Sequence, residues 1–274
     1  MMSRISWIKR IGSSALDLIY PPGLYCISCG KITDSSRTYG LCNECMAAAG
    51  WITGRHCEKC GKPLSQNDRG PMCFSCRDSG SGSQPHVFDK GYACTAYDSV
   101  AQSVIFALKY GSRSDIGYNI GEILYDRMLS EFDADELAGM YDLVIPVPIY
   151  FEKKKKRGYN HADLMAECFA SRAGIRCETE ALIRTRATKP MKGLGPEERR
   201  ANISGAFDVR ARKRSLIRGS RILLIDDIYT TGSTLDEIAG ILKEPWTDGD
   251  GIEHSGASRV DFLAYAAAAD YLIV

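Results

Sequence analysis

The sequence predicts an α/β protein in which a small cysteine-rich module precedes a domain built on a mostly parallel sheet. Two observations support this fold class. Eight cysteines gather in the first third of the chain, and short apolar segments alternate with amphipathic ones from residue 87 onward. With 274 residues, the chain can form one large domain or two modest ones. Hydrophobic residues make up 45% and charged residues 25%, which excludes collagen-like, coiled-coil and wholly disordered chains.

Residues 1–22 form the first predicted unit, an amphipathic helix over 4–19. Apolar side chains recur there three or four positions apart, at Ile8, Ile11, Ala15 and Leu18. We expect this helix to pack on the body of the protein; the alternative, contact with a membrane surface, has few cations to support it. The segment lacks the apolar centre of a signal peptide, and no apolar run reaches the ~18 residues that cross a bilayer. We therefore expect a cytoplasmic protein without a transmembrane segment.

The cysteines follow a duplicated pattern. Eight of the eleven form four CxxC pairs, and twelve residues separate the first pair from the second and the third from the fourth. The stretch CISCGKITDSSRTYGLCNEC recurs 31 residues later as CEKCGKPLSQNDRGPMCFSC. The pairs are Cys26 and Cys29, Cys42 and Cys45, Cys57 and Cys60, and Cys73 and Cys76. This spacing is an internal duplication of a unit with two cysteine knuckles.

Each repeat has the ligands for one closed, tetrahedral zinc site. Two thiolates two residues apart bind one edge of a tetrahedral Zn²⁺, and a second such pair binds the opposite edge. We therefore predict a double zinc ribbon over 23–80 with two structural Zn²⁺ ions, whose binding replaces a large apolar core. Redox CxxC motifs are disfavoured because they occur singly in a βαβ setting. Pairing of the first knuckle with the third stays open.

A linker and an alternating domain follow. The polar, Gly- and Ser-rich stretch 77–86 predicts the linker, and 87–274 the second domain. Strands are expected near 90–97, 141–146, 221–226 and 259–266, and helices near 99–109, 115–131, 160–173 and 233–243. The acidic stretch 244–258 is expected to be a surface loop. Short, continuously apolar strands that alternate with helices indicate a parallel sheet covered on both faces.

The segment LLIDDIYTTGSTL, residues 223–235, indicates a sugar-phosphate site. Asp226 and Asp227 end an apolar strand, so they lie at the carboxyl edge of a parallel sheet, where ligands bind. The next turn combines hydroxyls with a glycine and opens a helix, whose free amides and dipole attract an anion. It consists of Thr230, Thr231, Gly232, Ser233 and Thr234. The motif can thus accept two ribose hydroxyls and bind one phosphate.

Alternatives to this interpretation are limited. The chain contains neither GxGxxG nor GxxxxGK[ST], which excludes the usual dinucleotide and P-loop motifs. A helix capped by Thr or Ser explains Thr231 or Ser233 but not the adjacent acids. Aspartates engaged in salt bridges, or a turn filled by neighbouring side chains, would instead count against the ribose-phosphate role. The only interpretation left would then be a scaffold stabilised by its metal ions.

Charge is unevenly distributed along the chain. Residues 152–221 contain 19 basic and 8 acidic side chains, whereas 222–274 contain 2 basic and 10 acidic ones. The two blocks either neutralise each other in the fold or leave a basic surface for a polyanion. Four consecutive lysines lie in the basic block, where they form a solvated turn or contact a nucleic-acid backbone. These are Lys153, Lys154, Lys155 and Lys156.

The loop at 223–235 resembles the phosphoribosyl pyrophosphate (PRPP) loop of type I phosphoribosyltransferases, with one extra threonine. Three further segments narrow the resemblance: FALKYGSR (106–113), VIPVPIYFEKKKKRGYNHADLMA (144–166) and TKPMKGLGPEERRANISGAF (188–207). Together with the cysteine knuckles, they make the chain similar to the ComF family over nearly its whole length. The resemblance implies a zinc ribbon joined to a type I phosphoribosyltransferase-like parallel sheet. It also implies DNA uptake in natural transformation, with single-stranded DNA and DNA-import proteins as partners.

The resemblance also implies residue roles. Asp226 and Asp227 would hold the ribose hydroxyls, the turn 230–234 the 5′-phosphate, and Mg²⁺ would bind with PRPP. Pro146 and Val147 would form the pyrophosphate side, with Lys109 and Arg157 as cations. Residues 184–202 would be a hood that closes over the site. Its expected polar contacts are Arg199, Arg200 and Asn202. Relatives usually have Thr-Pro-Pro-Gln where this chain has Thr-Lys-Pro-Met at 188–191, so the glutamine contact is missing.

Two functional hypotheses stay open. In the first, the protein binds PRPP with Mg²⁺ and single-stranded DNA and acts in DNA uptake. In the alternative, it is an active PRPP-dependent phosphoribosyltransferase that releases pyrophosphate on an unidentified acceptor. No residue of the motifs is an evident nucleophile or general base, which fits both a sensor and an enzyme whose acceptor brings its own nucleophile.

Overall fold

The computed structural model describes residues 24–33, 38–65, 68, 70–77, 85–111, 113–189 and 193–268. The helix predicted within 1–22 lies outside these residues, as do 78–84 of the predicted linker and Pro190 and Met191 of the predicted hood. Among the described residues, no helix has both the length and the apolar character needed to cross a membrane.

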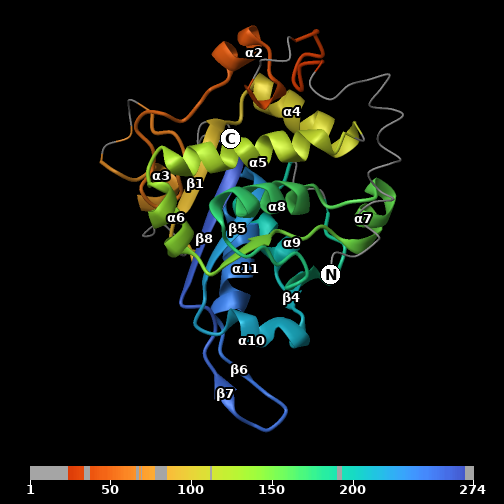
Figure 1. The fold of residues 1–274 in the computed structure, drawn as a ribbon. Coiled ribbons are helices and arrows are strands. Elements are labelled where there is room, and N and C mark those ends of the chain that lie inside the picture. The colour runs from red at the N-terminus through yellow and green to blue at the C-terminus, as the bar shows by residue number, and fades with distance from the viewer. Residues whose placement is uncertain are drawn as a thin grey trace.

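The central sheet has four parallel strands: β1 (Gly91–Ala96), β2 (Leu143–Pro146), β5 (Arg221–Tyr229) and β8 (Arg259–Ala267), in the order β1-β8-β5-β2 (Figure 1). Ile222 to Ile225 of β5 are all buried, because alternate side chains enter two hydrophobic cores on opposite faces of the sheet. The predicted α/β fold class with a parallel sheet and a preceding ribbon is confirmed.

One face of the sheet is covered by the long helices α4 (Ser99–Tyr110), α5 (Asp115–Leu129) and α8 (His161–Ala173) (Figure 1). Helices α5 and α8 approach closely because small residues lie between them. A Cβ atom on Gly121 would come within 2.4 Å of the Cβ of Cys168. The short helix α6 (Ala134–Met140) precedes β2.

The other face carries α11 (Ser233–Lys243) and an antiparallel strand pair, β3 (Leu182–Arg184) with β4 (Phe207–Val209). In the chain, β3 and β4 are connected through α9 (Pro196–Ile203), which packs on α11. The short helices η2 (Ala211–Lys213) and α10 (Arg214–Ile217) lead into β5. This face therefore brings the predicted hood next to the loop that opens α11.

The cysteine-rich module contains η1 (Thr38–Gly40), α2 (Asn43–Ala48) and α3 (Phe74–Arg77), and it covers the open edge of β1. The amide of Ile52 donates to the carbonyl of Cys94 at 2.9 Å, and the amide of Gly91 donates to the carbonyl of Lys59 at 2.8 Å. Trp51 also forms an antiparallel bridge with Thr95. The module thus pairs an edge strand that would otherwise expose its backbone groups.

Two segments differ from their predicted form. Residues 153–156 belong to the helix α7 (Phe151–Arg157) and not to a turn, and 244–258 contain a hairpin of β6 (Trp246–Thr247) and β7 (Glu253–His254). Contacts within the hairpin hold it: the rings of Trp246 and His254 lie 4.6 Å apart, and His254 Nε2 lies 2.7 Å from Asp248 Oδ2. Neither segment has an apolar period, so no local pattern predicted its structure.

Candidate sugar-phosphate site and metal clusters

The turn between β5 and α11 encloses a small cavity. Strand β5 extends past both aspartates to Tyr229, and the chain then turns through Gly232, whose φ of 83° favours glycine. The cavity has a volume of about 40 Å³, room for about three water molecules. Its lining is Arg199, Asp226, Ile228, Tyr229, Thr230, Thr231, Gly232, Ser233, Thr234 and Leu235. The five residues of the predicted loop therefore come together around one space at a helix N-terminus.

Asp226 is the aspartate that faces this cavity. Its Oδ1 accepts a hydrogen bond from the amide of Asp227 at 2.8 Å. Burial, and then the negative charge of Asp227, raise the pKa of Asp226 well above its ordinary value. A half-buried carboxyl group of this kind favours a neutral or hydrogen-bonded state, so it suits a ligand hydroxyl.

Asp227 does not line the cavity and is held inside the protein. Its carboxylate forms an ion pair with Lys109 and lies 3.5 Å from His161 Nε2, and its side chain is 8% exposed. Although burial alone raises the pKa of Asp227, Lys109 and His161 lower it well below its ordinary value. Asp227 is thus engaged in a salt bridge, which counts against its predicted role as a ribose ligand. Asp226 has no salt bridge to any residue that the structure describes.

Arginines from the hood side complete the surroundings of Asp226. Arg199 on α9 lines the loop cavity, and Arg184 at the end of β3 interacts electrostatically with Asp226. Burial lowers the pKa of Arg184, and Asp226 partly opposes that effect. In the described part of the chain, the buried Nε atoms of both arginines have no hydrogen-bond partner. Unpaired buried arginine donors near this cavity fit an anionic ligand.

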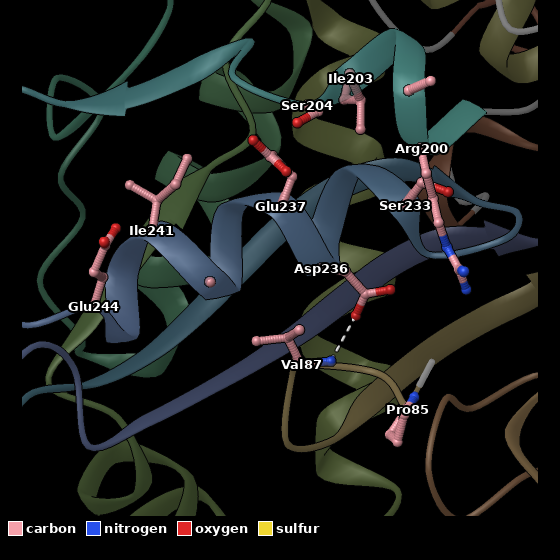
Figure 2. Close-up of a pocket in the computed structure, with 12 residues that line it drawn as sticks. Pro85, Val87, Arg200, Ile203, Ser204, Ser233, Asp236, Glu237, Ile241 and Glu244 are labelled. Carbon is pink, nitrogen blue, oxygen red and sulfur yellow. Dashed lines mark hydrogen bonds between the residues drawn. The ribbon is translucent and has the colours of Figure 1, made fainter. Parts of the chain in front are cut away.

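The two other predicted hood residues lie apart from the loop cavity. The side chain of Asn202 binds the backbone of Lys189 through a donor and an acceptor, both at 3.0 Å. Arg200 lines a second, larger cavity of about 530 Å³ between α9, α11 and residues 85–87 (Figure 2). Asn202 thus has a local structural contact, and Arg199 is the hood residue nearest the loop.

Basic and aromatic side chains line a separate pocket of about 380 Å³. The guanidinium of Arg157 lies 5.5 Å from the ring centroid of Tyr110, an exposed side chain at the end of α4. Lys154 turns away to Asp163, with 3.0 Å between nitrogen and oxygen. The lining residues are Lys109, Tyr110, Lys153, Lys156, Arg157 and Tyr159. The structure thus brings Lys109 and Arg157 to one pocket with two of the four predicted lysines.

Pro146 and Val147 lie at the carboxyl end of β2, beside β5. Pro146 pairs with Ile225, and the amide of Val147 donates to the carbonyl of Ile225 at 2.9 Å. Asn160 holds the same turn by donating to the carbonyl of Val147 at 3.2 Å. The predicted pyrophosphate turn is therefore at the same edge of the sheet as Asp226.

The cysteines gather in two sets of four, and each set follows the sequence order. In each set, the four sulfur atoms lie within 4.8 Å of one another. The Sγ atoms of Cys29 and Cys42 are 3.7 Å apart, as are those of Cys60 and Cys73, which matches the ~3.8 Å edge of a tetrahedron with Zn–S bonds of about 2.3 Å. The two clusters thus fit the two predicted structural zinc sites. The alternative, in which the first CxxC pair shares a site with the third, is wrong.

Comparison with known proteins agrees with these features. Residues 15–77 match the family model of the double zinc ribbon domain. The DNA utilization protein YhgH of Escherichia coli O6:H1 is 28% identical over 206 residues, 74% of this chain and 84% of that protein. Competence protein F of Haemophilus influenzae is 27% identical over 80% of this chain and 90% of its own. Competence protein ComFC of Bacillus subtilis is 28% identical over 74% of this chain and 78% of its own.

These matches support the similarity to the ComF family that the sequence motifs indicate. Among solved structures, it is similar to a glutamine PRPP amidotransferase from B. subtilis in complex with ADP and GMP. The TM-score of that match is 0.30 at 18% sequence identity, and it covers 57% of this chain and 39% of the amidotransferase chain.

The sequence patterns did not reveal four residues of this site. Arg184 lies in a short strand within the basic block, where nothing distinguishes it from a surface cation until β3 is placed beside Asp226. His161, the first residue of α8, faces Asp227. His86 and Lys62 lie behind the loop, next to Gly232 and Tyr229. Their positions depend on contacts between segments far apart in the chain, which no local pattern reports.

Proposed function

We propose that this protein binds PRPP with Mg²⁺ and acts in DNA uptake or utilisation. The observation that carries the proposal is the small cavity at the N-terminus of α11, with Asp226, Arg199 and four Ser or Thr residues on its walls. The helix that begins within this turn has eleven residues, so several free amides and a helix dipole face the bound anion.

We assign different roles to Asp226 and Asp227, whereas the sequence alone implied the same role for both. In our proposal the loop holds the 5′-phosphate and Asp226 accepts a ribose hydroxyl. Asp227 instead fixes Lys109 at the carboxyl edge of the sheet. Arg184 and Lys109 balance the charge of the pyrophosphate, whose oxygens, with the ribose diol, bind Mg²⁺, since this cation prefers hard oxygen ligands.

Ligand-dependent stability tests this proposal. A ligand that binds only the folded state at 100 times its Kd adds about 2.7 kcal/mol to the free energy of unfolding, so PRPP with Mg²⁺ is expected to raise the melting temperature of the full chain. Asp226→Asn should abolish the rise. Asp142→Asn is the matched control, because Asp142 pairs with Arg221 at the opposite end of β5. A rise that survives in Asp226→Asn, or is absent in the wild type, contradicts the site.

Single-stranded DNA is the proposed partner of the basic pocket. Four cations line this pocket with two tyrosines, and Lys109 is shared between it and the acid pair at the sheet edge. Cations bind the phosphate backbone and aromatic rings stack on bases without regard to sequence. Phe106 extends this aromatic surface, because its ring lies 4.9 Å from that of Tyr110 and both are about two-thirds exposed. The competence and DNA-utilisation names of the relatives support this role.

The salt dependence of DNA binding tests the partner. Lys153→Ala with Lys156→Ala removes two pocket cations, whereas Lys154→Ala with Lys155→Ala removes two charges from the same helix outside the pocket. If each pocket lysine contacts one phosphate, the slope of log K against log salt falls by about 1.4 in the first variant. Equal slopes in both variants contradict the assignment. Pyrophosphate release that requires a free base would instead identify the protein as an active transferase.

A further inference from the structure

Residues 85–89 connect the cysteine-rich module to β1 and lie directly behind the phosphate loop. The amide of Val87 donates to Oδ1 of Asp236, on the first turn of α11, at 2.8 Å (Figure 2). Pro85 and Val87 form one wall of the cavity between this segment, α11 and α9. A segment from the zinc ribbon side therefore fixes the start of the helix whose N-terminus forms the phosphate site.

His86 makes the closest contacts with the loop. Its Nδ1 lies 2.8 Å from Oδ2 of Asp236, and its Nε2 lies 3.4 Å from the hydroxyl oxygen of Tyr229. A Cβ atom on Gly232 would come within 2.8 Å of Cε1 of His86, so the imidazole packs against the turn itself. The His86 side chain is 7% exposed. The ring therefore holds both ends of the loop, Tyr229 before it and Asp236 after it.

The second zinc cluster, formed by Cys57, Cys60, Cys73 and Cys76, lies on the other side of Tyr229. Cys57, Cys60 and Cys73 belong to the same buried cluster as Tyr229, Phe88 and Phe262. The ammonium of Lys62, two residues after Cys60, lies 5.1 Å from the ring centroid of Tyr229, and Lys62 is buried. The ring of Tyr229 stacks on Phe262 at 4.7 Å. The last residue of β5 is thus packed between the sheet and the metal cluster.

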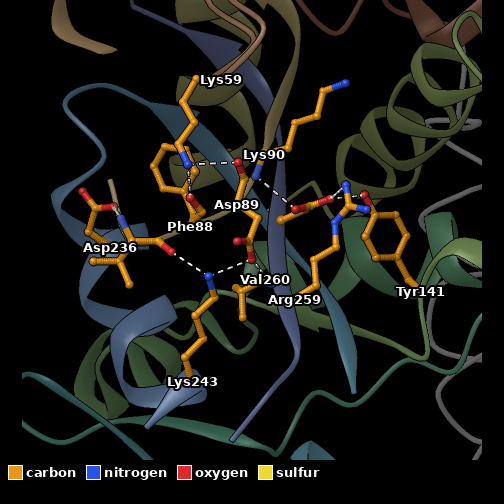
Figure 3. A network of polar contacts seen from close by, with 11 residues as sticks. Lys59, Phe88, Asp89, Lys90, Tyr141, Asp236, Lys243, Arg259 and Val260 are labelled. Carbon is orange, nitrogen blue, oxygen red and sulfur yellow. Dashed lines mark hydrogen bonds and ion pairs between the residues drawn. The ribbon is translucent and has the colours of Figure 1, made fainter. Parts of the chain in front are cut away.

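Polar contacts tie the segment around the same cluster to Phe88 and Asp89 (Figure 3). The ammonium of Lys59 donates to the carbonyl of Phe88 at 2.5 Å and to that of Asp89 at 3.0 Å. On the far side, Lys243 of α11 donates to the carbonyl of Val87 at 2.8 Å and pairs with Asp89 at 2.7 Å. Residues 87–89 are thus held between the second zinc cluster and α11, so a shift of the cluster would move the helix.

The first zinc cluster, formed by Cys26, Cys29, Cys42 and Cys45, has no comparable link within the described residues. Its buried cysteines, Cys26 and Cys45, belong to the core on the opposite face of the sheet, with α4, α5 and α8. The duplicated halves of the ribbon therefore pack on different faces, and the half formed by Cys57 to Cys76 packs against the phosphate loop.

We infer that the second zinc cluster positions the phosphate loop, with His86 as the positioning residue between them. Loss of the metal at Cys57, Cys60, Cys73 and Cys76 then weakens phosphate binding, whereas loss of the metal at the first cluster does so much less. This inference rests on the proposed PRPP site and adds control of that site by one of two zinc ions.

The test compares PRPP affinity, in the presence of Mg²⁺, across full-length variants by calorimetry. His86→Ala is expected to bind about tenfold more weakly, equal to a loss of about 1.4 kcal/mol. His86→Asn should recover part of the loss, because its amide can donate to Asp236. His56→Ala is the control, a ribbon histidine that pairs with Glu131, and should bind like the wild type. Zinc content and the unliganded melting temperature are measured in each, since a purely structural role would lower stability and leave the Kd of the folded protein unchanged.

The metal itself is tested at equivalent ligands of the two repeats, Cys45→Ser and Cys76→Ser. The loss of affinity at Cys76→Ser should exceed that at Cys45→Ser by at least about fivefold. Equal losses, or a His86→Ala variant that binds like the wild type, overturn the inference. A wild-type chain that does not bind PRPP overturns the proposed function itself, so the two failures are distinct. If Cys76→Ser does not fold, the His86 series decides.

Discussion

Replacing Asp227 with asparagine should destabilise the protein by about 3 kcal/mol. Removing one partner of a buried ion pair leaves the other charge uncompensated, at a cost of about 3–5 kcal/mol. Asp227 and Lys109 form such a pair, with side chains 8% and 23% exposed. The lower end of the range applies because Lys109 keeps some contact with solvent.

A double-mutant cycle measures the pair directly. Asp227→Asn, Lys109→Met and the double variant are compared by urea unfolding at neutral pH. The double variant should lose less than the sum of the single losses, with a coupling energy of about 2 kcal/mol. Losses that simply add would show that the pair makes no net contribution to stability and would refute the reasoning.

The dependence of stability on pH gives a second view of the same pair. The pKa of Asp227 is lower in the folded protein than in the unfolded chain, because Lys109 and His161 favour its charged form over the opposing effect of burial. Its contribution is therefore complete above the unfolded pKa of about 3.9 and is lost as the pH falls below that value. Asp227→Asn should flatten the acid side of the stability curve.

Asp226, whose pKa is raised by burial and then by Asp227, should show the opposite trend: Asp226→Asn raises the unfolding free energy of the unliganded protein at pH 8, and the gain shrinks toward pH 4. Urea unfolding that shows no gain would contradict the burial of its charge. Gly61→Ala should cost about 3 kcal/mol and the equivalent Gly30→Ala about 1 kcal/mol, by urea unfolding. Both have φ of 73°, but only at Gly61 would a Cβ meet backbone, 2.7 Å from the Gly91 carbonyl oxygen; equal losses would refute that packing. Metal analysis should find about two zinc ions per chain, and a chelator that removes them should lower the melting temperature; iron or disulfides would overturn the cysteine assignment.

Local patterns in the sequence were sufficient for the main elements. The helix predicted at 233–243 is α11 with the same bounds, and the strand predicted at 259–266 is β8 with one more residue. These segments have strong apolar periodicity and turn residues at their ends, which report local structure directly. The strands β3 and β4 have three residues each, too few for a period to be visible.

The cysteine spacing predicted two metal sites of four cysteines each, because a zinc site needs only four ligands with a short chain between them. Which CxxC pairs share a site stayed open until the structure grouped them. Sequence also placed the loop 230–234 at a helix N-terminus. It could not distinguish the roles of Asp226 and Asp227, since adjacent side chains in a strand point to opposite faces. Which of the two meets Lys109 and His161 depends on how α4 and α8 pack.

Sequence patterns alone therefore predict the parallel sheet, two four-cysteine sites and the loop 230–234 at a helix N-terminus. The packing of the folded chain brings Arg184 and Arg199 around Asp226 and sets the second zinc cluster behind the loop through His86 and Tyr229. This difference follows from the range of the interactions. Backbone conformation and chelation act between neighbours in the chain, whereas these contacts join segments up to about 150 residues apart that meet only when both faces of the sheet are covered.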